Sequence, residues 1–303
     1  MDEIQRSFWI RMPRPVHQVI RKCLRLAIRL CRGCVRVSVL AVFFTIALVG
    51  RYRKKRIDVG LGPEPLINNV YHKRALERLG YTAETFVNTV FFITDEFDLR
   101  VDEWANKGWW GRIPLGNTLR FYLGCAYLAT LQLTRYRCLY IYFHGGELGH
   151  LGGIVARCEP FLLRVARVKV VVMPYGGDVH DMSRCPTLSF KHAMSCDYPL
   201  HCLRRPDIAT RIDRWTRHAD HVISGCDWVD YMHHWDTLTL GHFSIDTQQW
   251  KPDTSSSTSV NETLRILHAP NHRTIKGSGF FVRAVNELRD EGVDVELVVL
   301  EGV

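Results

Sequence analysis

Short apolar runs that alternate with helix-like stretches constrain the fold of this chain most strongly. Each run ends in glycine or polar residues, and the clearest ones from residue 57 onward are IDVGLG, CLYIYFHGG, RVKVVVMPYGGD and ADHVISGC. Helical periodicity lies between them, at residues 68–81, 119–133 and 208–218. Strands that alternate with helices predict a parallel sheet with helices on both faces. The sequence therefore predicts an α/β fold whose ligands bind in the loops after the strands.

A second strand–helix pattern begins after a Ser/Thr-rich segment. Residues 251–263, KPDTSSSTSVNET, have no periodicity and are typical of a linker. After them, LRILHAP predicts a strand, GSGFFVRAVNELRDEG a helix and VDVELVVLEGV another strand. We expect one complete Rossmann-like domain at residues 57–250 and the first βαβ unit of a second at residues 264–303. Because a lone βαβ unit cannot bury both faces of its sheet, we expect a truncated second domain or a partner that completes it.

Residues 1–56 hold most of the positive charge. They contain 14 Lys and Arg against two acids, whereas the whole chain carries +9, so the remaining residues together carry −3. Five arginines recur there at helical spacing, namely Arg21, Arg25, Arg29, Arg32 and Arg36. This pattern is typical of a basic amphipathic helix on anionic lipid. A nucleic-acid groove would need basic residues in the folded body, so the charge distribution indicates a membrane surface and no nucleic acid.

An uncharged run follows at residues 37–50, VSVLAVFFTIALVG. It is shorter than the roughly 20 residues of an ideal membrane span. It therefore predicts a short membrane anchor, a monotopic helix that dips into the interface, or a buried helix of a soluble protein. Basic residues flank it on both sides, so charge gives no orientation. We expect the body in the cytoplasm, with a lumenal body on a type II anchor as the alternative.

The phosphate-binding motifs of nucleotide enzymes are mostly missing. No G-x-x-x-x-G-K-[ST] occurs, and Gly60-Leu-Gly62 is followed by proline without a third glycine, so P-loop and nicotinamide sites are disfavoured. Residues 268–280, HAPNHRTIKGSGF, instead place a strand, a polar turn and a helix start in succession. A helix N-terminus offers unpaired N–H groups to an anion, and Arg273 and Lys276 add full positive charge. The segment is suited to a diphosphate; the alternative is a solvated basic turn.

Histidines and cysteines crowd the region between residues 180 and 202. The members are His180, Cys185, His192, Cys196, His201 and Cys202. Their spacing matches no standard zinc motif, and we interpret the region as a loop. The sequence therefore predicts no metal site.

The second unit and linker resemble the retaining, family-4-type glycosyltransferases of the two-Rossmann (GT-B) fold. In that family a strand, a basic turn with Lys-Gly and a helix open the donor-binding domain, as LRILHAPNHRTIKGSGFFVRAVNELRDEGVDVELVVLEG does here. RWTRHADHVISGCDWVDYM, GHFSIDTQQWKP and VVVMPYGGDVHDM are also similar to parts of the family's first domain. The resemblance covers residues 57–303. It implies a GT-B-like α/β fold, preceded here by an N-terminal hydrophobic and basic helix.

The resemblance implies a donor site in the second unit. Lys276 and Gly277 would contact the donor diphosphate. The basic partner of the lysine would be Arg273, or Asn271 at the position where many members carry it. The family's acidic pair, a Glu-x7-Glu-like motif that grips the donor sugar, is expected beyond residue 303.

The resemblance also implies an acceptor side in the first domain. Gly60 and Gly62 with the following PEP, and Gly176 and Gly177 in the YGGD loop, would form loops near the acceptor and the phosphates. Asp178 and His144 are the candidate catalytic residues, for acceptor binding or proton transfer. The structural alternatives are a helix cap for Asp178 and a hydrogen bond to a buried backbone group for His144.

The implied function is a membrane-associated enzyme that transfers a sugar from a nucleotide-sugar to a lipid-linked or glycan acceptor, with retention. It would need no metal and no cofactor beyond the nucleotide-sugar substrate, because the cationic turn stabilises the leaving diphosphate. The alternative is a non-catalytic, membrane-bound scaffold that binds glycan or lipid and needs a partner for activity.

Overall fold

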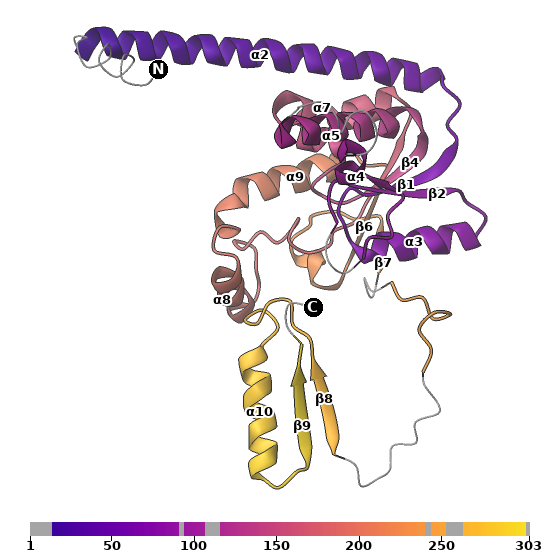
Figure 1. The fold of residues 1–303 in the computed structure, drawn as a ribbon, viewed down its shortest axis with the longest axis vertical. Helices are drawn as coiled ribbons and strands as arrows, with labels where there is room; N and C mark the ends of the chain where they lie inside the picture. The colour runs from indigo at the N-terminus through magenta and orange to yellow at the C-terminus, as the bar shows by residue number, and fades with distance from the viewer. Residues whose placement is uncertain (1–13, 91–93, 107–115, 240–243, 253–262, 301–303) are drawn as a thin grey trace.

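The structure is a computed structural model that describes residues 14–90, 94–106, 116–239, 244–252 and 263–300. Its main sheet has seven strands, all parallel, in the order β3-β2-β1-β4-β5-β6-β7 (Figure 1). The strands are β1 (Ile57–Leu61), β2 (Ala83–Val87), β3 (Leu99–Arg100), β4 (Tyr136–Ile141), β5 (Lys169–Val172), β6 (His221–Gly225) and β7 (Thr237–Thr239). This is the doubly wound, Rossmann-like order, and its direction reverses between β1 and β4.

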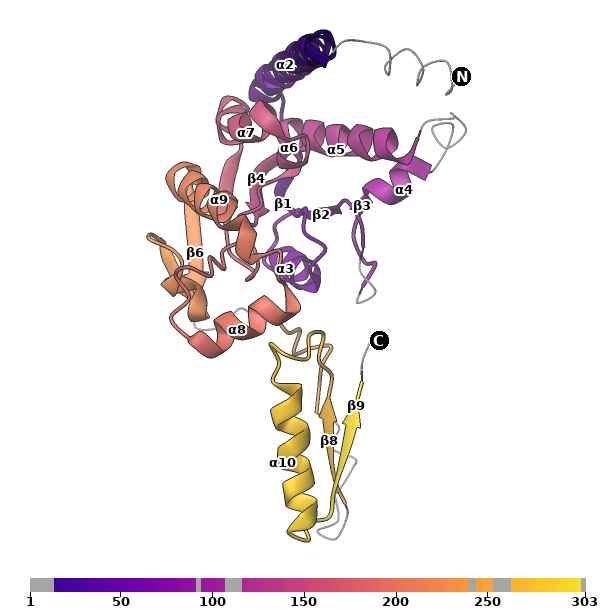
Figure 2. The ribbon, with the colours of Figure 1, turned by 90° about the vertical axis from the view of Figure 1, so that its left-hand side faces the viewer.

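Helices cover both faces of the sheet, as the alternating pattern predicts. On one side lie α2 (Arg14–Tyr52), α5 (Asn117–Thr134) and α7 (Gly153–Val165), and on the other lies α3 (Ile67–Arg78) (Figure 2). The remaining helices of this domain are α4 (Val101–Asn106), α6 (Glu147–His150), α8 (Leu188–Asp197) and α9 (Arg205–His218). Helix α8 corrects our interpretation of residues 180–202 as a loop throughout, because ten of them are helical.

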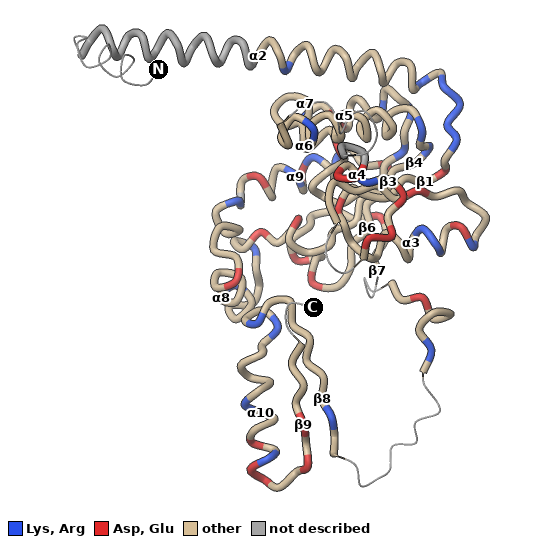
Figure 3. The backbone as a smooth tube through the Cα atoms, in the orientation of Figure 1, with Lys and Arg blue, Asp and Glu red and all other residues tan. Residues whose placement is uncertain are grey.

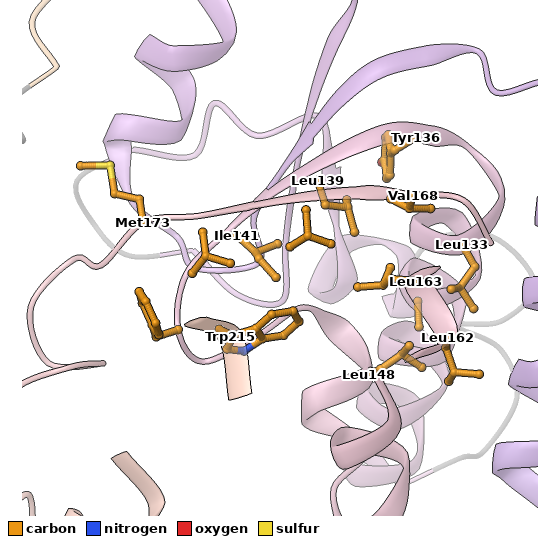
Figure 4. Packing of buried hydrophobic residues seen from close by; sticks show 14 of the residues in the cluster. Leu133, Tyr136, Leu139, Ile141, Leu148, Leu162, Leu163, Val168, Met173 and Trp215 are labelled. Atoms are coloured by element: carbon orange, nitrogen blue, oxygen red, sulfur yellow. The ribbon is translucent and has the colours of Figure 1, made fainter. Parts of the chain in front are cut away.

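The core lies between the central strands and the α5–α7 side. Leu139 and Ile141 on β4 pack with Leu133, Leu163 and other fully buried side chains (Figure 4). Burial of each such side chain contributes about 1.5–3 kcal/mol. This well-packed layer fixes β4 and β5, whose carboxyl ends carry the loops of the candidate site.

The N-terminal segment forms one continuous helix of 39 residues, α2. Its residues Gly33–Tyr52 are long and apolar enough to cross a membrane. In the structure, however, Phe43, Ala47 and Gly50 are buried where α2 packs on α5 and α7. The side chains of the first four predicted stripe arginines lie outside the described residues, and Arg36 is exposed.

The second unit has the predicted β–α–β order. It consists of β8 (Leu264–His268), α10 (Ser278–Asp290) and β9 (Val295–Val299), and its two strands are parallel. Most of the predicted linker, residues 253–262, lies outside the described residues. The observed fold is therefore α/β with a Rossmann-like sheet, followed by a separate βαβ unit.

Candidate functional site

Three loops bring polar side chains together where the strand order reverses. Glu64 follows β1, His144 follows β4 and Tyr175 follows β5. The imidazole Nδ1 of His144 lies 2.8 Å from Glu64 Oε1 and 3.0 Å from the Tyr175 hydroxyl. The side chains of His144 and Glu64 are 30% and 20% exposed, so a ligand can reach them. We call Glu64, His144 and Tyr175 the switch-point triad, because ligands of doubly wound sheets bind at this place.

A buried amide fixes the loop that carries Glu64. Asn69, in the first turn of α3, donates from Nδ2 to the Glu64 carbonyl oxygen at 2.9 Å. Its Oδ1 accepts a hydrogen bond from the Tyr142 hydroxyl at 2.7 Å. Both side chains are buried, so the bond between them is shielded from water and strengthened. Glu64 stood in the predicted PEP loop, but neither Asn69 nor Tyr142 was predicted.

Asp178 has a positioning role in this structure. Its side chain is fully buried, so the carboxylate is not exposed to a ligand. Oδ1 accepts hydrogen bonds from the N–H groups of Tyr175 and Gly176, and Oδ2 accepts one from Phe143, each at 3.0 Å. Burial raises the pKa of Asp178, opposed by the nearby His144 and by these donors. Asp178 therefore ties the β4 loop to the β5 loop and holds His144 beside Tyr175.

A small, mainly apolar cavity lies beside the switch-point triad. Its volume is about 140 Å³. Its aromatic lining comprises Tyr140, Tyr142, Tyr175 and Trp228, together with His72. Aromatic faces with a few polar groups at the edge are typical of small-molecule sites.

The predicted glycines have different roles. Gly60 lies inside β1 and not in the loop, and a Cβ there would be 2.8 Å from the ring of Tyr136. A Cβ on Gly62 would be 2.0 Å from the Phe86 carbonyl oxygen. Gly60 and Gly62 are therefore required by packing against neighbouring strands. Gly176 adopts a φ of 127° and donates to Asp178, and Gly177 has open space beside it.

The turn between β8 and α10 carries the residues that were predicted to bind a donor diphosphate. Gly277 precedes α10 with a left-handed φ of 66°, a conformation that favours glycine. Beside it lies a pocket of about 570 Å³ whose lining includes Arg273, Gly277 and, one turn into the helix, Arg283. Lys276 and Asn271 are exposed in the same turn. Two of the four predicted diphosphate ligands thus line the pocket, and Arg283 was not predicted.

The turn between β8 and α10 contacts the first domain. The Ile275 N–H donates to Asp197 Oδ2 at 2.9 Å, and the ring of His272 meets the Tyr198 hydroxyl. Asp197 is the last residue of α8, and Tyr198 follows it. The turn is therefore held against the end of α8 in the first domain.

Two buried acids lie beneath the His144 loop. Burial raises the pKa of Glu147 to about 8 and that of Glu159 to about 7. The N–H groups of Gly146 and Gly149 face the Glu159 carboxyl. A Cβ on Gly145 would come within 2.6 Å of a Glu159 oxygen, and the φ of 95° at Gly145 also favours glycine. Sequence patterns did not reveal these acids, because an acid in a helix usually faces water.

Within the described residues, no cluster of three or more His, Cys, Asp or Glu side chains could hold a metal ion. In the crowded region, His201 Nε2 bonds to the His180 carbonyl oxygen at 2.8 Å, and Cys196 contacts His192 on α8. Comparison with protein-family profiles, curated proteins and solved structures found no match for the chain.

Proposed function

We propose that the chain is a membrane-associated, retaining glycosyltransferase of the GT-B type, which moves a sugar from a nucleotide-sugar to a lipid-linked or glycan acceptor. The observation that carries the proposal is the contact between the donor-type turn and α8. Ile275 bonds to Asp197 at 2.9 Å, which holds a cationic helix N-terminus against the helix that follows the β5 loop. A cleft between two Rossmann-like units is a place where donor and acceptor can meet.

The donor side supplies electrostatic stabilisation. The pocket at the start of α10 combines Arg273 and Arg283 with the helix N-terminus, and Lys276 lies exposed in the same turn. Negative charge develops on the diphosphate as the sugar leaves it. Fixed cations and N–H groups stabilise that charge in the transition state, so the step needs no metal.

The acceptor side supplies an oriented imidazole. Glu64 Oε1 and the Tyr175 hydroxyl both lie at Nδ1 of His144, so a bound acceptor hydroxyl would meet the ring at Nε2. A carboxylate at Nδ1 favours a proton on that nitrogen and leaves Nε2 as an acceptor of hydrogen bonds. The aromatic cavity beside the triad would hold the apolar face of the acceptor.

A transfer assay tests the proposal. The full chain is incubated with membranes and labelled UDP- or GDP-sugars, and label in the lipid and glycan fractions is measured. We expect transfer that falls about 100-fold in His144→Gln, a typical loss for an acid–base residue. His192→Gln, on the exposed side of α8, is the matched control and should keep full activity. Absence of transfer, or equal activity in both variants, would contradict the enzyme; acceptor binding without donor binding would favour the scaffold.

A further inference from the structure

Exposed apolar side chains gather on the helical layer formed by α2, α5 and α7. On α2, every exposed residue from 41 to 49 is uncharged, and the large ones are Val42, Phe44, Leu48 and Val49. On α5, the exposed stripe consists of Leu119, Tyr122, Leu123 and Tyr127, and on α7 it includes Ile154 and Phe161. The rings of Phe44 and Phe161 are stacked with centroids 6.1 Å apart, so the apolar surface continues from α2 onto α7.

The charges on these helices have one sign. Within the described side chains of α2, α5 and α7, the one acid is Glu159, and it is buried (Figure 3). On the exposed face of α7, Arg157 lies between Ile154 and Phe161 in the sequence, and Arg164 follows Phe161. Basic residues also follow α2, including exposed Arg53, Lys54 and Arg56. Apolar side chains beside basic ones match the interface of an anionic bilayer. A soluble protein partner would not require that the charges beside the apolar surface be positive.

The packing of α2 argues against a helix that crosses the membrane. Figures 1 and 2 show α2 lying across α5 and α7. A Cβ on Gly50 would be 2.1 Å from the Leu133 carbonyl oxygen, so the two backbones touch. Phe43 and Ala47 are buried in the same contact. A helix that crossed the bilayer over residues 37–50 would have to leave this contact and uncover the apolar faces of α5 and α7.

We propose that the exposed faces of α2 (residues 33–52), α5 and α7 form a monotopic membrane seat, in which α2 lies in the plane of an anionic bilayer and the folded body itself enters the interface. Helix α2, at 39 residues, is long enough to run along the surface well beyond the body. The seat fixes which side of the sheet faces the lipid. It does not depend on the proposed glycosyl transfer.

Vesicle partitioning of the full chain tests the seat with residues outside α2. Binding to phosphatidylcholine vesicles, with and without phosphatidylserine, is measured for wild type, Phe161→Glu and Leu188→Glu. Phe161 is 56% exposed on α7, and Leu188 is 82% exposed on α8, which does not belong to the seat. Because both side chains are exposed, neither substitution disturbs the core. We expect Phe161→Glu to lower the partition coefficient about tenfold or more, Leu188→Glu to change it less than about twofold, and phosphatidylserine to strengthen binding.

The orientation of α2 is read from labelling on sealed vesicles. Cys34 is exposed at one end of the apolar stretch, and Tyr52→Cys adds a thiol at the other. An impermeant maleimide, mapped by mass spectrometry, should label both from outside if α2 lies in the plane. Labelling of only one end would overturn the proposal. Unchanged vesicle binding in Phe161→Glu would also overturn the proposal, because α2 alone would then anchor the chain. Light scattering would identify the remaining case, in which the apolar face joins two copies of the chain.

Discussion

Replacement of Asp178 by asparagine tests whether this residue ties the two site loops together. The Asp178 carboxylate accepts two N–H groups at Oδ1 and one at Oδ2, and it is fully buried. An asparagine can place its side-chain oxygen at the position of Oδ1 and keep the bonds from the Tyr175 and Gly176 N–H groups. Its NH₂ group would then face the Phe143 N–H, so that bond is lost and a donor meets a donor.

The cost follows from the bonds that change. A hydrogen bond to a charged group contributes about 1.5–3 kcal/mol, and a buried N–H without a partner costs about 1–3 kcal/mol. We expect Asp178→Asn to lower the free energy of unfolding by about 2–5 kcal/mol, since the two contributions overlap. Urea unfolding followed by circular dichroism measures it. A pH near 8 is suitable, because burial raises the pKa of Asp178 and the carboxylate must be ionised in the wild type.

Asp220→Asn is the matched control. Asp220 also accepts a backbone N–H, from Val170 at 2.9 Å, but its side chain is 38% exposed. An asparagine at this position can keep that bond, so we expect the free energy of unfolding to fall by less than about 1 kcal/mol. A loss below about 0.5 kcal/mol in Asp178→Asn, or an equal loss in both variants, would refute the positioning role.

Three further predictions concern pH, packing and chemistry. Because burial raises the pKa of Glu147 from 4.5 to about 8, the folded state keeps a proton that the unfolded state releases, so the unfolding free energy should fall as pH rises between these values. Glu147→Gln should flatten that slope in urea titrations at several pH values, and an unchanged slope would contradict the assignment. Gly33→Ala, with nothing within 4 Å, should stabilise the chain by up to about 1 kcal/mol. Gly50→Ala, whose Cβ would be 2.1 Å from a carbonyl oxygen, should destabilise it by about 1–3 kcal/mol in thermal melts, and effects of the same sign would argue against close packing of α2. In the transfer assay, Glu64→Gln should slow turnover less than the His144 substitution does, and the reverse order would reassign their roles.

Much of the main sheet could be predicted, because its central strands are apolar runs that end at glycine or polar residues. Strands β3 and β7 could not, since LR and TLT are too short to show a period. Helix α8, LSFKHAMSCD, was missed because its buried residues are few.

The site was harder to predict than the fold. His144 and Glu64 are 80 residues apart, and they meet only because β1 and β4 are neighbours in the sheet. The sequence indicated Asp178 as a candidate residue, because it follows Gly176 and Gly177 after a predicted strand. It did not indicate the role of Asp178, because only the folded loops show that both carboxylate oxygens face backbone N–H groups.

The donor turn carries the proposed function, so titration calorimetry with UDP and GDP tests it most directly. We expect saturable nucleoside-diphosphate binding that weakens about 10–100-fold in Arg273→Ala, the loss expected for a charged hydrogen bond. Arg265→Ala is the control, because Arg265 lies on β8, is 71% exposed and pairs with Glu296; it should bind like the wild type. No binding of either diphosphate, or equal binding by both variants, would contradict a donor site at this turn.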